Sequence, residues 1–351
     1  MILVVCLNPA LDITHHVPAV DWSGVNRPRA VDTRPGGKGL NVARTLLALG
    51  ADVLVLGLAG GATGGAVRSG LAELAVPSDL TPIAGETRRT FTVLDQARHT
   101  TALFNEPGPP ITGPEFQTFL DNFEGLLPGA QAVVLSGSLP LGLPADTYAT
   151  LISRARLAGA GPGPSSVPEN PIRISSNISP FDHSSRGVPV VLDAHGDDLR
   201  LGVAAGPAIV KPNLDELEDL AGHPLSLAGD GTGRPAVLEA ASDLRSAGAG
   251  AVVVSLGPAG LRAVTAGGGW QAVPPAVEAV NPTGAGDAVV AGLTWGLVTG
   301  QPWPDRLRDA AALGTAATLA PVAGEFDPDE YSRLRSNVMV AELSRRNGGG
   351  G

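Results

Sequence analysis

Residues 280–293 read Val-Asn-Pro-Thr-Gly-Ala-Gly-Asp-Ala-Val-Val-Ala-Gly-Leu and join a glycine-rich turn to the start of an apolar helix. Gly284, Ala285 and Gly286 carry almost no side chain, so the backbone N–H groups at the helix start are bare. Such groups bind anions, and the helix dipole adds to the attraction. The carboxylate of Asp287 could accept a proton from a hydroxyl that attacks this anion. The stretch indicates phosphoryl transfer to an alcohol, with an ordinary glycine-rich turn as the alternative.

The composition of the 351-residue chain is that of a globular protein, with 43% hydrophobic and 17% charged residues. The net charge of −10 argues against a nucleic-acid surface or an anionic membrane as partner, although a local cationic pocket stays open. The only cysteine, Cys6, cannot form an internal disulfide, which favours a cytoplasmic location. We expect neither a signal peptide nor a membrane span, because Met1 leads directly into a strand-like segment and no apolar run is long enough.

Strand-like and helix-like segments alternate along most of the chain. Residues 2–7 form a continuous apolar run, typical of a strand covered on both faces. Further strand-like runs (53–58, 132–135, 189–192, 208–211 and 251–256) alternate with helical stretches (66–74, 115–127, 146–157, 214–221 and 237–247). This alternation predicts an α/β fold with a doubly wound, mainly parallel sheet flanked by helices.

Other segments depart from this pattern. Runs 87–94 and 100–104 are β-rich without a helix between them and predict a hairpin, and the polar residues from Asp12 to Arg34 predict short exposed strands beside it. The Pro- and Ser-rich segment 161–187 predicts a surface insertion, and the glycines of 347–351 predict a flexible tail.

Small or polar residues follow nearly every predicted strand, at the sheet edge where ligands gather in open α/β folds. Asp12 comes soon after the first strand. Residues 36–39 make a second glycine-rich helix start, in which Lys38 and Asn41 could face one ligand. It is not a Walker P-loop, because Lys38 is followed by glycine. The alternative is a tight turn with a solvated lysine.

Residues 211–216, Lys-Pro-Asn-Leu-Asp-Glu, connect a predicted strand to a helix. Asn213 and Glu216 lie one helical turn apart, so both can face a cation-bound phosphate, although an ordinary capping box explains the same spacing. Ser255 begins a third glycine-rich strand end, which suits approach by a nucleotide or a simple turn. The loose matches to a dinucleotide-binding motif do not lie between a strand and a helix, and the histidines lack the spacing of metal ligands. The sequence also has no serine-hydrolase motif of the G-x-S-x-G type.

Four ordered signatures make the chain resemble the PfkB, or ribokinase-like, carbohydrate kinases. They are Leu7-Asn-Pro-Ala-Leu-Asp12, Gly36-Gly-Lys-Gly-Leu-Asn41, Lys211-Pro-Asn-Leu-Asp-Glu216 and Thr283-Gly-Ala-Gly-Asp287. The resemblance covers almost the whole chain outside 161–187. Stretches 25–27, 86–88, 104–109 and 136–140 are similar to the branch of 1-phosphofructokinases and tagatose-6-phosphate kinases.

The resemblance implies one ribokinase-like kinase domain over residues 1–345, with a small β lid made of segments 12–35 and 86–106 that often serves as a dimer interface. It implies a sugar-phosphate kinase that uses ATP and Mg²⁺. A 1-phosphofructokinase is the leading expectation, and a tagatose-6-phosphate kinase or 6-phosphofructokinase is the alternative within the family. A non-catalytic sugar-phosphate sensor is the alternative from another class.

The resemblance also implies roles for individual residues. Asp287 would be the catalytic base, and residues 284–286 would form the anion hole. The sugar phosphate would be held by Asp12, Gly37, Lys38, Asn41, Arg88 and Asn105. The nucleotide would contact Lys211, Asn213, Ser255, Gly257 and Gly260, and Glu216 would act on magnesium through water. Thr90, Leu103 and Ala288 depart from the residues usual in the branch, which leaves the identity of the sugar open.

Overall fold

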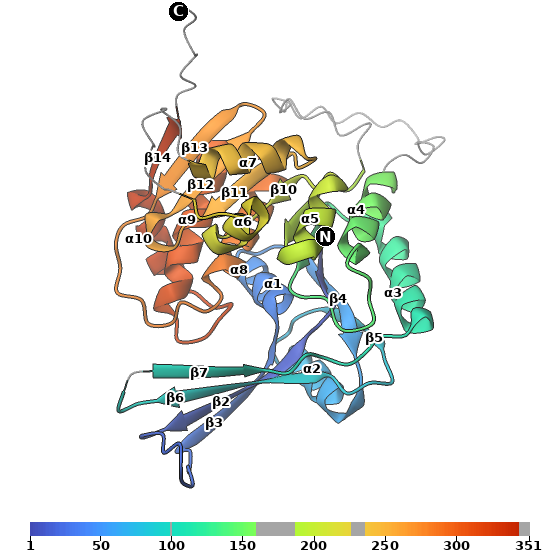
Figure 1. The fold of residues 1–351 in the computed structure, drawn as a ribbon, viewed down its shortest axis with the longest axis vertical. Coiled ribbons are helices and arrows are strands. Elements are labelled where there is room, and N and C mark those ends of the chain that lie inside the picture. The colour runs from blue at the N-terminus through green and yellow to red at the C-terminus, as the bar shows by residue number, and fades with distance from the viewer. Residues whose placement is uncertain (99, 159–186, 226–235, 344–351) are drawn as a thin grey trace, which may run out of the picture.

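The structure is a computed structural model that describes residues 1–98, 100–158, 187–225 and 236–343. These residues form a large layered body and a separate four-stranded sheet that projects from it (Figure 1). The predicted tail and all of the predicted insertion except Gly187 lie outside the described residues. No helix in the described part of the chain is long and apolar enough to cross a membrane.

The large body is built on a ten-stranded sheet in the order β14-β13-β12-β11-β10-β9-β8-β1-β4-β5. Seven neighbouring strands are parallel: β1 (Ile2–Cys6), β4 (Val53–Ala59), β5 (Ser78–Pro82), β8 (Ala132–Ser136), β9 (Val190–Asp193), β10 (Ile209–Val210) and β11 (Ala251–Ser255). The antiparallel edge consists of β12 (Leu261–Thr265), β13 (Gly268–Val273) and β14 (Met339–Leu343). The prediction of a mainly parallel, doubly wound sheet is confirmed.

Helices cover both faces of this sheet, because both faces of its strands are apolar. Alternate residues of β1 belong to two different buried clusters, Val4 to one and Leu3 to the other. The cluster of Val4 is closed by α1 (Lys38–Ala48), α2 (Gly61–Glu73), α8 (Ala285–Val298), α9 (Trp303–Leu319) and α10 (Pro328–Asn337). The cluster of Leu3 is closed by α3 (Gly113–Leu126), α4 (Thr147–Leu157), α5 (Gly196–Ala204), α6 (Leu214–Ala221) and α7 (Ala236–Ser246).

The four-stranded sheet, called the lid sheet below, has the order β3-β2-β6-β7. Its strands are β2 (Ala10–Val17), β3 (Ala30–Gly36), β6 (Arg88–Asp95) and β7 (Thr100–Asn105). The predicted hairpin is present, since β6 and β7 are antiparallel with Phe91 opposite Phe104. β2 pairs with β3 in antiparallel and with β6 in parallel fashion, so both predicted lid segments join one sheet.

Candidate active site

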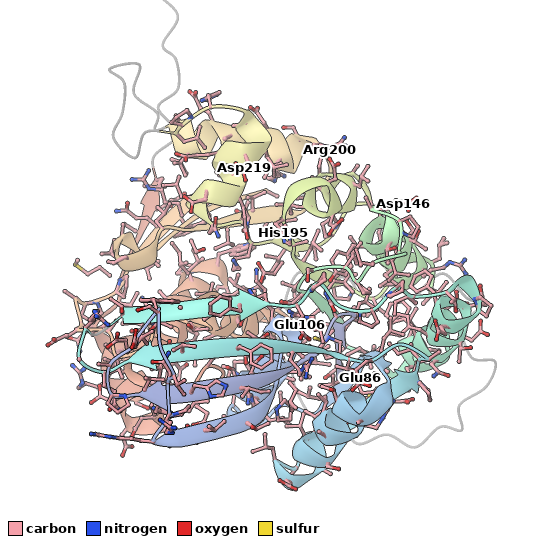
Figure 2. The ribbon with its side chains drawn as sticks, turned by 60° about the horizontal axis from the view of Figure 1, so that its bottom comes forward. Glu86, Glu106, Asp146, His195, Arg200 and Asp219 are labelled. Carbon is pink, nitrogen blue, oxygen red and sulfur yellow. The ribbon has the colours of Figure 1, made fainter. Side chains whose placement is uncertain are left out.

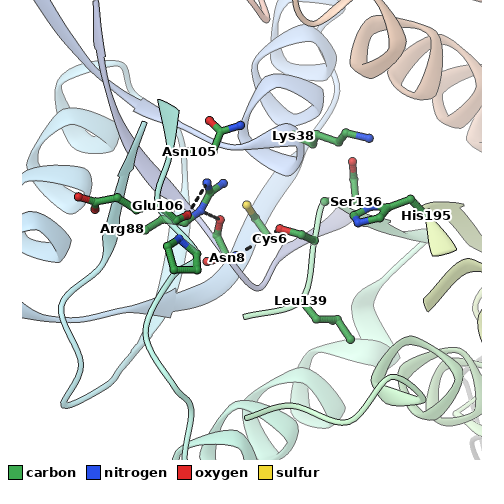
Figure 3. A pocket seen from close by; sticks show the side chains of 12 residues that line it. Cys6, Asn8, Lys38, Arg88, Asn105, Glu106, Ser136, Leu139 and His195 are labelled. Atoms are coloured by element: carbon green, nitrogen blue, oxygen red, sulfur yellow. Dashed lines mark hydrogen bonds between the residues drawn. The ribbon is translucent and has the colours of Figure 1, made fainter. Parts of the chain in front are cut away.

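A cavity of about 500 Å³ lies where the lid sheet meets the carboxyl ends of β1 and β8 (Figure 3). Its lining contains three of the predicted substrate residues, Lys38, Arg88 and Asn105, together with Cys6, Asn8, Glu106, Pro107, Ser136, Gly137, Ser138, Leu139 and His195. Figure 2 shows two of these from farther away, Glu106 beside the lid strands and His195 on the large body at the start of α5. The cavity is therefore bounded by both parts of the molecule.

Asp287, the predicted base, lies in the first turn of α8 and is only 5% exposed. Its Oδ2 accepts a hydrogen bond of 2.8 Å from Asn41 Nδ2. Burial, reinforced by the charge of Asp193, raises the pKa of Asp287 to about 7, although the Asn41 hydrogen bond and two lysines oppose the shift. A carboxyl group with a pKa near neutrality is well suited to accept a proton from a hydroxyl.

The glycine-rich turn before Asp287 has a backbone conformation that requires glycine at its first position. Gly284 caps α8 with φ 84°, and a Cβ there would lie 2.9 Å from the Cβ of Ala323. The N–H of Ala285 donates to the carbonyl oxygen of Pro282 over 3.3 Å. The following N–H groups, of Gly286 and Asp287, belong to the first turn of the helix and have no acceptor within it. These two groups are available to an anion, whereas Ala285, also expected in the anion hole, donates its N–H within the turn.

Asp193, which the sequence analysis missed, is the centre of the charges beside this turn. It ends β9, is 1% exposed, and has Lys211 Nζ 3.1 Å from Oδ1 and Lys38 Nζ 3.6 Å from Oδ2. Ser136 Oγ donates to Oδ2 over 3.3 Å. Burial opposes ionisation, but Lys211 and Lys38 hold the pKa of Asp193 below its usual value. Its position directly after the predicted apolar run 189–192 is the signal that could have found it.

Lys211, predicted to bind nucleotide, is almost completely buried. Besides its contact with Asp193, its Nζ lies 3.8 Å from the point where a Cβ on Gly286 would sit. The ammonium group is thus placed under the glycine-rich turn, next to the place expected for an anion. Its charge reaches that place at short range in a low-dielectric surrounding.

Asn213 and Glu216 form the capping box that was the alternative interpretation of their spacing. Asn213 Oδ1 accepts from the Glu216 N–H, and Glu216 Oε2 accepts from the Asn213 N–H, each over 2.8 Å. The other carboxylate oxygen, Oε1, is 3.9 Å from Lys38 Nζ. Capping therefore uses one oxygen of Glu216 and leaves the second facing the charged cluster.

The remaining nucleotide candidates lie at the end of β11. Ser255 forms a parallel bridge with Asn213, so these two candidates are neighbours. Gly257 and Gly260 have φ of 55° and 85°, and a Cβ on Gly260 would lie 2.1 Å from the carbonyl oxygen of Ala272. The glycine at 260 is therefore required by the turn itself, whatever else it contacts.

Asp12 lies on β2 of the lid sheet and not among the twelve residues that line the cavity. A Cβ on Gly36 would come within 1.9 Å of Asp12 Oδ2, so the glycine makes room for this carboxylate. Burial raises the pKa of Asp12, while a hydrogen bond from Thr90 and the charge of Arg88 oppose the rise. Gly37, at the start of α1, has φ 116° and lies against Cys6.

Arg88 enters the cavity from the first residue of β6. Its Nε donates to the Asn8 carbonyl oxygen over 3.1 Å and its Nη1 to the Glu106 carbonyl oxygen over 3.4 Å. Glu86 accepts from the first backbone N–H groups of α2, and Asp95 lies at the far end of β6. The charges of Asp12 and Glu106 interact with that of Arg88 through space. The guanidinium thus donates to backbone carbonyls and forms no direct ion pair with a carboxylate among the described residues.

Several residues that line the cavity were assigned no role from the sequence. Asn8 Nδ2 donates to Ser138 Oγ over 3.2 Å, and both follow apolar strands, which is the pattern that flagged the other candidates. Cys6 lines the cavity between Arg88 and Lys38 (Figure 3). Burial raises the pKa of its thiol to about 11, so the sulfur stays protonated and is a poor nucleophile.

Comparison with known proteins connects this geometry to a family. Residues 3–170 and 182–329 match the domain described as pfkB family carbohydrate kinase. The chain belongs to the PfkB family. It is therefore a sugar kinase with the ribokinase-like fold, and kinases of this family use ATP.

Solved structures of similar proteins support the assignment of this PfkB kinase. Phosphofructokinase-2 from Escherichia coli in complex with potassium is 29% identical with a TM-score of 0.81, covering 95% of this chain and 98% of that one. The same enzyme in complex with fructose-6-phosphate has the same identity and coverage and a TM-score of 0.79. A possible 1-phosphofructokinase from Thermotoga maritima is 24% identical with a TM-score of 0.78, covering 98% of this chain and 100% of that one, and shows the shared fold.

Proposed function

We propose that this PfkB kinase transfers the γ-phosphoryl group of ATP to a hydroxyl of a phosphorylated ketohexose, with fructose 1-phosphate as the preferred acceptor. The observation that carries the proposal is Arg88, a cation that reaches the cavity and forms no direct ion pair with a carboxylate among the described residues. Lys38 lies on the opposite side of the same cavity (Figure 3). A phosphate on the sugar gives such a site its counter-charge, which a free sugar cannot.

Fructose 6-phosphate is the second candidate acceptor. The similar E. coli phosphofructokinase-2 has a solved complex with that sugar phosphate. Tagatose 6-phosphate remains a third acceptor to include in any assay. All three carry one phosphate and free hydroxyl groups, so the same cavity chemistry applies to each.

In the proposed reaction the acceptor hydroxyl oxygen attacks the γ-phosphorus while the bond from that phosphorus to the ADP oxygen breaks. The hydroxyl proton passes to the carboxylate of Asp287, whose pKa of about 7 makes the ionised form accessible near neutral pH. The N–H groups of Gly286 and Asp287 and the ammonium group of Lys211 face the charge on the transferred group. Asp12 and Asn105 would orient the sugar from the lid side.

The nucleotide would lie along Asn213, Ser255 and the glycines at 257 and 260. Glu216 fits a magnesium role, because one of its carboxylate oxygens is free of the capping box and faces the charged cluster. Bound Mg²⁺ would neutralise charge on the nucleotide phosphates. A cytoplasmic location stays a prediction that rests on the single cysteine.

We also propose a homodimer formed through the outer face of the lid sheet. Along β7 successive side chains point to opposite faces, so Phe104 lies on the face opposite that of the cavity residue Asn105. The strand register places Phe91, Ile13 and Val31 on the same face as Phe104. Phe104 and Val31 are each 52% exposed, which is unusual for large apolar side chains unless a partner covers them.

The acceptor is tested by measuring ADP release with fructose, fructose 1-phosphate, fructose 6-phosphate and tagatose 6-phosphate, and by identifying the product by phosphorus NMR. We expect the highest kcat/KM with fructose 1-phosphate. Asp287→Asn is the matched negative control, with kcat lowered by several orders of magnitude and ATP affinity retained. Binding of a sugar phosphate without turnover by the wild type would instead identify a sensor.

A further inference from the structure

The orientation of the Asn41 side-chain amide decides whether the proposed base, Asp287, faces a hydrogen-bond donor or an acceptor. Asn41 has an amide oxygen that only accepts hydrogen bonds and an amide NH₂ group that donates them. Its NH₂ group faces Asp287 Oδ2, at 2.8 Å. In this orientation the amide stabilises the ionised carboxylate. Rotated by half a turn, it would present its oxygen and favour the protonated acid.

Arg44 supplies the contact that selects the first orientation. It lies on α1, three residues after Asn41, and its Nη2 donates to Asn41 Oδ1 over 2.5 Å. The same nitrogen donates to the Ala323 carbonyl oxygen over 3.0 Å. A Cβ on Gly324 would lie 2.9 Å from Arg44 Nε, so the glycine is needed to let the guanidinium lie there.

The chemistry of the guanidinium makes this selection strict. Arginine has five N–H donors and no acceptor, so only the amide oxygen of Asn41 can face it favourably. Nε and Nη1 of Arg44 are buried and have no hydrogen-bond partner among the described residues. The structure thus keeps a partly desolvated cation in this place, and the charges of Glu325 and Asp12 oppose the cost of its burial.

We propose that Arg44 is a positioning residue that holds the Asn41 amide with its NH₂ group toward Asp287, and so keeps the base in the form that accepts a proton. The inference rests on the proposed role of Asp287. It adds to the catalytic arrangement a side chain that does not line the cavity and is not one of the expected nucleotide contacts.

The groups that face Asp287 come from four other parts of the fold. Asn41 and Lys38 approach from α1, Lys211 from the end of β10, Asp193 from β9, and Cys6 from β1. The pKa of Asp287 is raised by burial and by Asp193, and lowered by the Asn41 hydrogen bond and by both lysines. Loss of the hydrogen bond therefore raises it further, and Arg44 also acts weakly through space as a cation.

The first experiment compares pH profiles of kcat/KM for the wild type, Arg44→Met and Arg44→Lys. We expect Arg44→Met to move the acidic limb to higher pH by about one unit, the scale of a lost hydrogen bond to a carboxylate. Arg44→Lys keeps a charged donor and should restore most of the wild-type profile. Arg68→Met is the structural control, because Arg68 also donates to carbonyl oxygens, those of Leu80 and Ala59, but does not line the cavity.

A double-mutant comparison tests whether the effect passes through Asn41. In an Asn41→Ala background, removal of Arg44 should shift the acidic limb much less than in the wild type. An unmoved limb in Arg44→Met, or a shift of undiminished size in the Asn41→Ala background, would overturn the inference. If Arg44→Met does not fold, Arg44→Gln replaces it as a neutral residue of intermediate length.

The same shift is measurable without catalysis. The difference in unfolding free energy between a protein and its Asp287→Asn counterpart, followed over pH, reports the pKa of Asp287 in the folded state. We expect this pKa to be higher with Arg44→Met than with arginine, and an equal value refutes the inference. A wild type that phosphorylates no sugar phosphate refutes the proposed function instead, so the two failures are distinct.

Discussion

Lys211 and Asp193 form an ion pair that is almost completely withdrawn from solvent, with Nζ 3.1 Å from Oδ1 and side chains 4% and 1% exposed. Lys211 comes from the end of β10 and Asp193 from the end of the neighbouring strand β9. Two parallel strands thus place opposite charges at the same edge of the sheet, directly below the glycine-rich turn of α8. A pair in this position holds the charges of the site in place before any substrate arrives.

Lys211→Met should destabilise the protein by about 3 kcal/mol, because it leaves the buried carboxylate of Asp193 without its nearest cation. Lys38→Met is the matched control: Lys38 also contacts Asp193, but at 3.6 Å and with 42% of its side chain exposed, so its loss should cost clearly less. Chemical unfolding at pH 7 measures both. Equal losses would mean that the depth of burial does not govern this pair.

Asp287 should make the protein less stable as the pH rises. Its pKa is about 7 in the folded protein and 3.8 as the ordinary value, so the folded state holds the proton more tightly than the unfolded chain. The free energy of unfolding must then fall as the pH increases from about 4 to about 7. Asp287→Asn cannot ionise, so it should be more stable than the wild type at pH 8, by on the order of 4 kcal/mol.

The difference between Asp287→Asn and the wild type should shrink toward pH 4, where both side chains are neutral. Asp193→Asn is the control of opposite sign, because the lysines keep the pKa of Asp193 low and its ionised form stabilises the folded state. Urea unfolding across pH 4–8 gives all three curves. A constant difference between Asp287→Asn and the wild type would show that Asp287 titrates normally.

The sequence predicted the parallel part of the fold because its strands are buried on both faces and read as unbroken apolar runs, as in residues 2–7. It missed β5, Ser78–Pro82, which lies at the sheet edge and is short and polar. It also missed the antiparallel edge strands β12–β14, whose apolar runs are short and interrupted. The parallel pairing of β2 with β6 is non-local, and no local pattern encodes it.

For the site, the glycine-rich helix starts and strand ends were visible as motifs, and the structure brings Lys38, Asn41 and Asp287 together. Asp193 was missed because the predicted strand was ended at residue 192, whereas Asp193 is the last residue of β9. Arg44 was missed for another reason. It lies within a helix at an ordinary position, and only the fold shows that its guanidinium contacts the amide of Asn41.

Phe104→Glu should prevent the proposed dimer, because it places a charge in the apolar outer face of the lid sheet. Leu103→Glu is the control: Leu103 is about as exposed, at 53%, but its side chain lies on the opposite face of the same strand. Sedimentation velocity and light scattering should give the mass of a dimer for the wild type and Leu103→Glu, and of a monomer for Phe104→Glu. A monomeric wild type would exclude the interface.

Arg88 should decide the preference for phosphorylated sugars. Its guanidinium forms no direct ion pair with a carboxylate among the described residues, and a phosphate can accept two parallel hydrogen bonds from it. Arg88→Ala should therefore lower the ratio of kcat/KM for fructose 1-phosphate to kcat/KM for fructose. The change corresponds to a loss of roughly 2–4 kcal/mol of transition-state binding. Fructose itself, which offers no anion, should lose much less.

Arg89→Ala is the matched control for this comparison. Arg89 is the next residue along β6, and its guanidinium pairs with Glu106 at 3.0 Å. Since that pair satisfies its charge, its removal should leave the ratio nearly unchanged. Steady-state kinetics on both variants, with fructose 6-phosphate and tagatose 6-phosphate as further acceptors, separate the alternatives. Equal losses for fructose and fructose 1-phosphate in Arg88→Ala would assign Arg88 to holding the loop at Asn8 and Glu106, and the anion of the substrate would then have to be bound by Lys38.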